Sequence, residues 1–424
     1  MGETIAFGTV ALLGLLGLGF PVFLAFLLVN VAIIALEIGP MGYGMFINSM
    51  LSTATTQALS TIPLFILMGE IIFRAGAVDR LFVSIQSVVG FIPGRQNVVA
   101  MLLSAILSAL SGASMAVAAM LGRTVLPSLL SRGYDKKLST GTILAGASLA
   151  PIVPPSVLVI ILGTLAEESI AKLLVAGLVP GFLLACIFTC YIIFRSRAGQ
   201  DGCQEEDVEC SPITDALPLI GLILLILGAI LTGVATPTEA AAVGVVGALG
   251  VSKLYNTLSF KLLADSVIEA TKLGCMIILI MICAKFFSQL LAMSGVADGL
   301  EQLIMSVSTH PYILLLLVML IPFFLCMLID QIALLLIIVP IYKGLLDYMP
   351  VEPLVFWFLL LVNITVGGIT PPFGYTLFAL KGSTDLVSLT DIYRSVIPFI
   401  VVYFVFCIFL VFNPWLITWV PSLL

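Results

Sequence analysis

The chain has 424 residues, of which 61% are hydrophobic and only 9% are charged. A soluble domain carries about 25% charged residues, so this composition excludes a soluble protein and indicates a polytopic α-helical membrane protein with spans of ~20 apolar residues. The formal net charge of −6 gives no reason to expect a nucleic-acid partner.

The first twenty residues, MGETIAFGTVALLGLLGLGF, form an apolar run that contains no Lys or Arg. A cleavable signal peptide begins with a basic region, which this run lacks. We therefore expect a retained first span. Residues 1–60 are predicted to supply the N-terminal spans of a scaffold.

Basic residues gather in a few connecting segments, and Lys and Arg are retained on the cytoplasmic side of a membrane. We therefore place these segments inside: 73–80, 93–95, 131–137, 194–199 and 252–261. An even number of crossings must then separate successive segments.

Residues 61–200 are predicted to form a first repeat under this constraint. A re-entrant hairpin at about 97–130 enters from the cytoplasm and returns, and a helix at about 138–166 crosses outward through a Pro-Pro break. Residues 201–214 are expected to form an acidic cytoplasmic loop, and residues 215–270 form scaffold and connecting helices.

Residues 271–390 are predicted to repeat this order upside down. After an amphipathic segment at 296–310 on the outside, a second re-entrant hairpin at about 311–346 enters from the outside. A helix at about 353–380 then crosses inward through a second break, and residues 391–424 supply the C-terminal span. A hairpin followed by a broken helix, twice and in opposite orientations, is the inverted-repeat arrangement of secondary transporters.

Both breaks contain a Pro-Pro pair, in SLAPIVPPSVLVI (148–160) and in NITVGGITPPFGYTL (363–377). Each pair removes two N–H donors, and the freed carbonyls are tolerated in a membrane only inside protein or beside a wet cavity. Carbonyl and hydroxyl oxygens suit Na⁺, and the helix N-terminus after each break suits an anion.

The sequence therefore predicts a combined sodium and substrate site at the two hairpin tips and the two breaks. Its residues are Ser111, Gly112, Ser114, Ser148, Pro154, Pro155, Ser156, Asp330, Gln331, Asn363, Thr365, Gly367, Gly368, Thr370, Pro371 and Pro372. No organic cofactor and no catalytic residue are expected.

Each part of this site has a plainer interpretation. The small residues of SGAS (111–114) also suit close helix packing, and Asp330 could make a structural hydrogen bond at the second tip. Lys285, an isolated charge in an apolar run, could attract the substrate anion, extend toward the membrane surface, or pair with an acid of a partner subunit.

At these motifs the sequence resembles the large membrane subunit of tripartite ATP-independent periplasmic transporters. The matching segments follow the family's order over most of the chain: IPLFILMGEIIFRAG (62–76), SGASMAVAAMLG (111–122), GYDKK (133–137), PIVPPS (151–156), GVATPTEAAAV (233–243), DQIALLLIIVPI (330–341) and GGITPPFG (367–374). Where the family often has Gly-Thr-Leu-Gly before the first Pro-Pro, this chain has Ala147, Ser148, Leu149 and Ala150.

The resemblance implies a sodium-driven importer of a small organic anion, such as a carboxylate, a sugar acid or a sulfonate, in a bacterial or archaeal inner membrane. It further implies a soluble periplasmic binding protein, a separate small membrane subunit of about four spans of ~20 residues each, and an elevator-type transport domain that moves against a scaffold. The sodium-binding regions of the family fall on the tips and breaks named above, with Asp330 at the hairpin aspartate.

Two alternatives stay open. A stand-alone sodium–carboxylate symporter would share the architecture and need no binding protein, whereas a passive channel would ignore a sodium gradient. The sequence disfavours a third alternative, an intramembrane serine hydrolase, because it has no G-x-S-x-G motif and its sole histidine, His310, is distant from SGAS.

Overall fold

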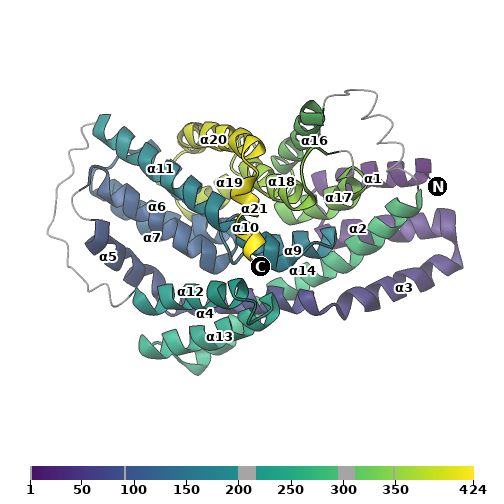
Figure 1. The fold of residues 1–424 in the computed structure, drawn as a ribbon, viewed down its shortest axis with the longest axis horizontal. Helices are drawn as coiled ribbons and strands as arrows, with labels where there is room; N and C mark the ends of the chain where they lie inside the picture. The colour runs from purple at the N-terminus through teal and green to yellow at the C-terminus, as the bar shows by residue number, and fades with distance from the viewer. Residues whose placement is uncertain (1, 90–91, 199–215, 295–310, 347–348) are drawn as a thin grey trace.

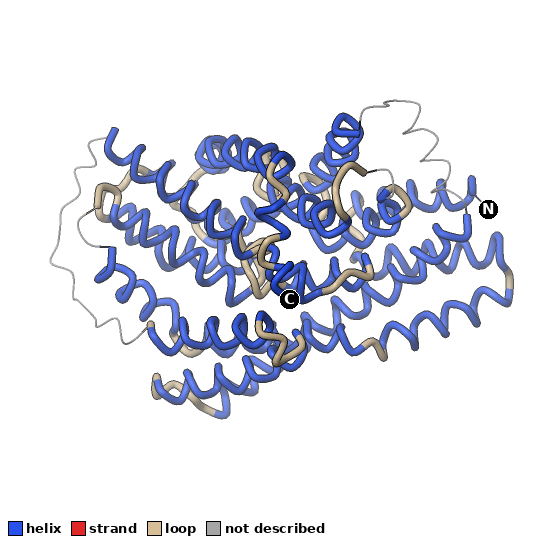
Figure 2. Tube along the Cα trace, viewed as in Figure 1, coloured by secondary structure: helices blue, strands red, loops and turns tan. Residues whose placement is uncertain are grey.

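The computed structural model describes residues 2–89, 92–198, 216–294, 311–346 and 349–424, and these residues form helices without any β-strand (Figures 1 and 2). The predicted acidic loop at 201–214 and the predicted amphipathic segment at 296–310 lie outside the described residues. The all-α fold with two helical hairpins and two broken helices is confirmed.

The first half contains the following elements: α1 (Gly2–Gly17), α2 (Val22–Ile33), the π-helix η1 (Ile34–Ile38), α3 (Pro40–Ala54), the 3₁₀-helix η2 (Gln57–Ser60), α4 (Thr61–Arg74), α5 (Ala77–Val89), α6 (Arg95–Ser111), α7 (Ser114–Ser131), α8 (Lys136–Ala147), α9 (Val157–Ala166), α10 (Ile170–Ala176) and α11 (Leu178–Ala198). Helices α6 and α7 form the first hairpin, and α8 and α9 are the two parts of the first broken helix.

The second half contains α12 (Leu217–Leu231), α13 (Pro237–Leu254), α14 (Phe260–Ser294), α16 (Pro311–Cys326), α17 (Gln331–Lys343), α18 (Pro353–Gly367), α19 (Tyr375–Ser383), α20 (Leu389–Phe412), α21 (Trp415–Thr418) and the 3₁₀-helix η5 (Pro421–Leu423). Helices α16 and α17 form the second hairpin, and α18 and α19 the second broken helix.

The helices next to the tips and breaks begin and end for local reasons. Gly112 ends α6 in the left-handed conformation, with φ +62°. The side chains of Asp135, Ser156 and Asp330 cap α8, α9 and α17 by accepting a hydrogen bond from a backbone N–H of the first turn. Such caps satisfy donors that a helix start leaves free.

The two halves differ in the stretches ahead of their hairpins. Segments α3, η2 and α4 precede α5 and the first hairpin as separate pieces, whereas α14 runs as one continuous helix ahead of the second hairpin. The predicted boundary at residue 270 therefore falls inside α14. Helices α4 and α14 pack together, with Arg74 paired to Asp265 at 3.8 Å and Pro63 against Gly274.

Five helical segments of the described residues are long and apolar enough to cross a membrane: Gln57–Arg74, Ser114–Ser131, Ile170–Arg197, Phe260–Met293 and Leu389–Phe412. Large apolar side chains stay exposed along α3, α12, α14 and α20, including Ile47, Leu224, Met276 and Val405. Such surfaces are compatible with lipid contact.

The hairpins pack on the broken helices of both halves. Helix α6 packs on α8 and α16 on α18, so each hairpin contacts the broken helix that follows it. In addition α7 packs along α19, and α17 packs along α9. The second arm of each hairpin thus lies against the broken helix of the opposite half, which interlocks the two repeats.

Gly146 is predicted to be essential for the contact of α6 with α8, because an added Cβ would lie 2.2 Å from Ser104 Cβ. We expect Gly146→Ala to destabilise the protein by about 1–3 kcal/mol through overpacking. The loss of stability is measured as a decrease in the melting temperature of the protein in detergent. Gly250→Ala in α13 is the control, since its Cβ would meet nothing within 4 Å; equal melting temperatures for the two variants would contradict the prediction.

Candidate ion and substrate site

The first hairpin tip lies directly against the first break. A Cβ added to Gly112 would lie 3.1 Å from Val157 N and 3.7 Å from Pro155 O. Gly112 is buried, and its left-handed φ already disfavours other residues. The backbone of the tip and the backbone of the break are therefore close neighbours, with no side chain between them at this point.

The first break presents carbonyl oxygens that have no recorded partner. Between α8 and α9, the hydrogen bonds among the described residues end on carbonyls up to Leu149, and those of residues 150–155 accept none. Ser156, fully buried, accepts a hydrogen bond from Val159 N at 3.4 Å as the cap of α9. Free carbonyl oxygens in a buried segment are ligands suited to an alkali cation.

The second hairpin is hydrogen-bonded to the helix before the second break. Cys326 Sγ and Gln331 Nε2 both donate to Ile364 O, at 3.0 and 3.4 Å, and Asn363 Nδ2 donates to Met319 O at 2.6 Å. An added Cβ on Gly367 would lie 2.7 Å from Cys326 Cβ. The end of α16 thus packs closely on the end of α18.

The second break folds back on itself around Gly368. The Gly368 carbonyl accepts from Thr376 N at 3.3 Å, and an added Cβ there would lie 2.4 Å from the Tyr375 hydroxyl. Tyr393 of α20 donates to Pro372 O at 2.6 Å. The Pro154–Pro155 and Pro371–Pro372 peptide bonds are both cis.

Tyr375 joins the two halves. Its side chain lies beside Ser114, the first residue of α7, and close to Cys326 and Asp330 of the second hairpin. Farther along the same pair of helices, an added Cβ on Gly122 of α7 would lie 2.4 Å from Ser383 Oγ of α19. Helices α7 and α19 therefore run side by side in the same direction from a common level.

These contacts bring four helix N-termini together. The start of α9 adjoins the first tip, the start of α7 adjoins the start of α19, and Asp330 caps α17 close to Tyr375. The C-terminal ends of α6, α8, α16 and α18 come to the same tips and breaks. N-terminal ends carry partial positive charge and C-terminal ends partial negative charge, so the region offers complementary groups to an anion and to a cation.

Two buried hydroxyl groups near this convergence make no hydrogen bond of standard geometry. Ser114 Oγ and Thr376 Oγ1 lie close to the Tyr375 side chain without such a bond, although Ser114 is only 5% exposed and Thr376 is fully buried. A buried polar atom without such a bond is costly and needs an explanation. Both hydroxyls are hard oxygen donors at the place where the helix N-termini meet.

Other predicted site hydroxyls already have partners. Ser148 donates a hydrogen bond to Ala145 O, and its hydroxyl is hydrogen-bonded to the Tyr403 hydroxyl of α20 at 2.7 Å. Ser148 therefore links the end of α8 to α20. Thr365 and Thr370 each donate to a carbonyl one turn earlier, at 2.7 Å. Asp330 is exposed at its tip, and Ser111 ends α6 with a side chain outside the described set.

Lys285 lies elsewhere, near an ion pair. Lys343, at the end of α17, contacts Glu167, at the end of α9, with 2.9 Å between Nζ and Oε2. The Lys343 ammonium, by hydrogen bond and charge, lowers the pKa of Glu167, and the charge of Lys285 adds a smaller contribution. Lys285 is therefore close to an acid of this same chain, whereas its contact with substrate stays a prediction.

Tyr375 and Thr376 are site residues that the sequence did not single out. Both directly follow the second Pro-Pro segment, in TPPFGYT, and occupy the first turn of α19. Ser156, which directly follows the first Pro-Pro pair, was recognised from its hydroxyl, whereas Phe373 directly follows the second pair. Thr376 lies three residues farther on, so aligning the two breaks position by position would not have identified it.

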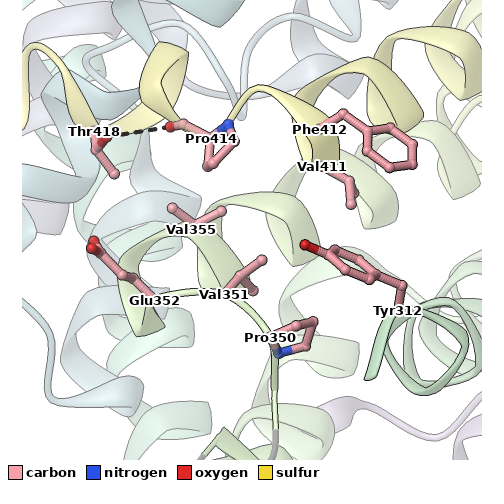
Figure 3. A pocket seen from close by; sticks show the side chains of 9 residues that line it. All are labelled: Tyr312, Pro350, Val351, Glu352, Val355, Val411, Phe412, Pro414 and Thr418. Atoms are coloured by element: carbon pink, nitrogen blue, oxygen red, sulfur yellow. Dashed lines mark hydrogen bonds between the residues drawn. The ribbon is translucent and has the colours of Figure 1, made fainter. Parts of the chain in front are cut away.

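The structure also contains a cavity of about 400 Å³ that includes none of the predicted site residues (Figure 3). It is formed where the starts of α16 and α18 meet the end of α20 and α21. Among the described residues no group of three or more His, Cys, Asp or Glu side chains could hold a metal ion.

Comparison with known proteins places these features in a family. The family model for "Tripartite ATP-independent periplasmic transporter, DctM component" matches residues 9–416. The Vibrio cholerae sialic acid TRAP transporter large permease protein SiaM is 30% identical, over 93% of this chain and 92% of its own. The Haemophilus influenzae sialic acid TRAP transporter permease protein SiaT is also 30% identical, over 91% of this chain, but this chain covers 66% of its length.

A third relative, the Pseudomonas aeruginosa C4-dicarboxylate TRAP transporter large permease protein DctM, is 28% identical over 85% of this chain and 86% of its own. The crystal structure of the Alcanivorax borkumensis YdaH transporter matches with a TM-score of 0.64 and 13% identity, covering 91% of this chain and 90% of that one. The last likeness concerns the fold alone.

Gly367 is predicted to hold the second hairpin against α18. In a variant whose only cysteine is Cys326, Gly367→Val should push α16 from α18 and break the Cys326–Ile364 hydrogen bond. We expect alkylation of Cys326 by a small membrane-permeant maleimide to become several-fold faster. Gly382→Val is the matched control, because an added Cβ there meets nothing within 4 Å. Unchanged alkylation in Gly367→Val would refute the contact.

Proposed function

Because the chain belongs to the DctM component family of tripartite ATP-independent periplasmic transporters, we propose that it imports a small organic anion driven by a sodium gradient. The family and its apolar helices make it a multi-pass protein of the bacterial inner membrane. The observation that carries the proposal is the meeting of four helix N-termini, two hairpin tips and two breaks in one region.

Sodium binding is supported by the chemistry of the site. The buried hydroxyls of Ser114 and Thr376, and the carbonyls of residues 150–155 that accept no backbone hydrogen bond, are hard oxygen donors. Asp330 adds a carboxylate at the second tip. A cation bound among them would bring the ends of α16 and α18 and the starts of α7 and α19 into one compact arrangement.

Substrate binding is supported by the N-termini of α7, α9, α17 and α19, whose dipoles favour an anion. Bound cations would strengthen this attraction, and the anion would in turn favour the sodium-loaded site. Such mutual stabilisation is the reciprocal coupling that lets an ion gradient drive uptake. The relatives named for sialic acid and for C4-dicarboxylates suggest a carboxylate-bearing substrate.

We further propose that a soluble periplasmic binding protein delivers the anion and that a separate small membrane subunit completes the scaffold. The interlocked hairpins and broken helices would move as one body, in an elevator motion, against the helices formed by α1–α4 and α12–α14. The interlocking supports this division, because α7 with α19 and α17 with α9 tie the two halves together. The activity is transport, with no catalytic role for the chain.

Uptake into proteoliposomes tests the function. The chain is reconstituted with its small subunit, and radiolabelled sialic acid or succinate is offered with and without an inward sodium gradient and with and without the binding protein. We expect uptake only when both are present. Sodium-driven uptake without the binding protein would favour the stand-alone symporter, and uptake indifferent to sodium would eliminate the coupling.

The two buried hydroxyls give a sharper test of the sodium site. We expect Ser114→Ala and Thr376→Val to raise the sodium concentration that gives half-maximal uptake by roughly tenfold each, since a lost ligand of a charged group costs about 1.5–3 kcal/mol. Thr124→Val is the control on α7, because its hydroxyl is exposed and bonded to Met120 O. Sodium dependence equal to wild type in both variants would remove them from the site.

A further inference from the structure

The cavity in Figure 3 joins four parts of the chain at one end of the molecule. Tyr312 comes from the start of α16, Glu352 and Val355 from the start of α18, and Val411 from the end of α20, while Thr418 belongs to α21 (Figure 3). Its volume, about 400 Å³, is in the range of small-ligand pockets. By the predicted topology this end faces the outside.

The lining combines apolar side chains with a comparable polar surface and carries one charge. Prolines, valines and Phe412 make most of the wall, and Glu352 is the only ionisable acid or base on it besides the Tyr312 phenol. Within the part of the chain that the structure describes, Glu352 has no Lys or Arg partner at ion-pair distance, since the recorded pairs involve other acids. A carboxylate without a basic neighbour repels anions, so the transported anion does not suit this cavity.

The surroundings are those of a membrane surface. Phe412 at the end of α20 is 70% exposed, and Trp415 and Trp419 next to it are 57% and 56% exposed. Exposed tryptophans gather at the level of the lipid headgroups, where an amphipathic ring has an apolar and a wet side. The cavity therefore opens at the level where headgroups and the first acyl carbons lie.

We propose that this cavity binds a lipid whose headgroup carries a primary ammonium, of the phosphatidylethanolamine class. The ammonium pairs with Glu352, near the Thr418 hydroxyl at the polar end of the cavity (Figure 3). The glycerol and upper acyl carbons lie along Val351, Val411 and Phe412. An ammonium group supplies the cation that Glu352 lacks, and the acyl chains suit the apolar wall.

The occupant would bridge several elements of the second half of the fold. Tyr312 belongs to the base of the second hairpin and stacks on Phe412 of α20, with ring centroids 6.2 Å apart and planes at 26°. Glu352 begins α18, the helix to which this hairpin is hydrogen-bonded. A lipid in the cavity thus contacts the base of the hairpin and both of the helices beside it.

Native mass spectrometry of the purified full chain tests the assignment. Wild type and Glu352→Gln are incubated with palmitoyl-oleoyl phosphatidylethanolamine or with the matching phosphatidylglycerol. We expect wild type to retain one phosphatidylethanolamine in preference to phosphatidylglycerol, and Glu352→Gln to bind it roughly tenfold more weakly, since it loses a charge-assisted contact. Glu269→Gln is the control, because Glu269 is an exposed acid of α14 paired with Lys272.

A charge reversal makes the test independent of a general loss of binding. Glu352→Lys should bind phosphatidylglycerol better than phosphatidylethanolamine, and the melting temperature of each variant reports folding. Equal retention of the two lipids by wild type, or equal phosphatidylethanolamine binding by wild type and Glu352→Gln, would overturn the proposal. So would displacement of the lipid by equimolar water-soluble phosphoethanolamine, which would identify a soluble amine as the occupant.

Discussion

Lipid cannot form hydrogen bonds with the backbone N–H and C=O groups that an interrupted helix leaves free. These groups must therefore be enclosed within protein, and this requirement determines how the helices of this fold pack. The two Pro-Pro breaks and the two hairpin tips are the interruptions, and each tip packs against a break or the helix leading to it. Gly112 and Gly367 make this possible, because an added Cβ would lie only 3.1 Å from Val157 N at Gly112 and 2.7 Å from Cys326 Cβ at Gly367. Close backbone approach at these two points is the constraint from which the rest of the arrangement follows.

The same constraint produces the chemistry. Once tips and breaks are held together, helix starts and helix ends meet in the middle of the protein, and their partial charges suit ions of opposite sign. Tyr375 is central to this arrangement because it lies on Gly368 of its own break, beside Ser114 of the other half and near Asp330. The enclosing of the breaks and the proposed binding of ions are therefore two effects of one packing pattern.

Local chemistry explains how much of this could be predicted from the sequence. Proline pairs, glycine-serine tips and the isolated Asp330 act within a few residues, so the hairpins and breaks could be placed to within a few positions. The contacts between residues far apart in the sequence could not be predicted in this way. Ser148 bonds to Tyr403, 255 residues away, and Ser114 meets Tyr375 across the two halves. Lys285 near Glu167, and a cavity built from four separate segments, likewise depend on packing that no local pattern encodes.

The unequal stretches before the two hairpins have a consequence for the transport cycle. In a transporter built from inverted repeats, facing inward and facing outward are related by exchanging the conformations of the two halves. Identical halves would make these two orientations degenerate. Here three separate segments, α3, η2 and α4, stand in one half where a single continuous helix, α14, stands in the other. In the transport cycle proposed above, the inward-facing and outward-facing orientations would therefore differ in energy.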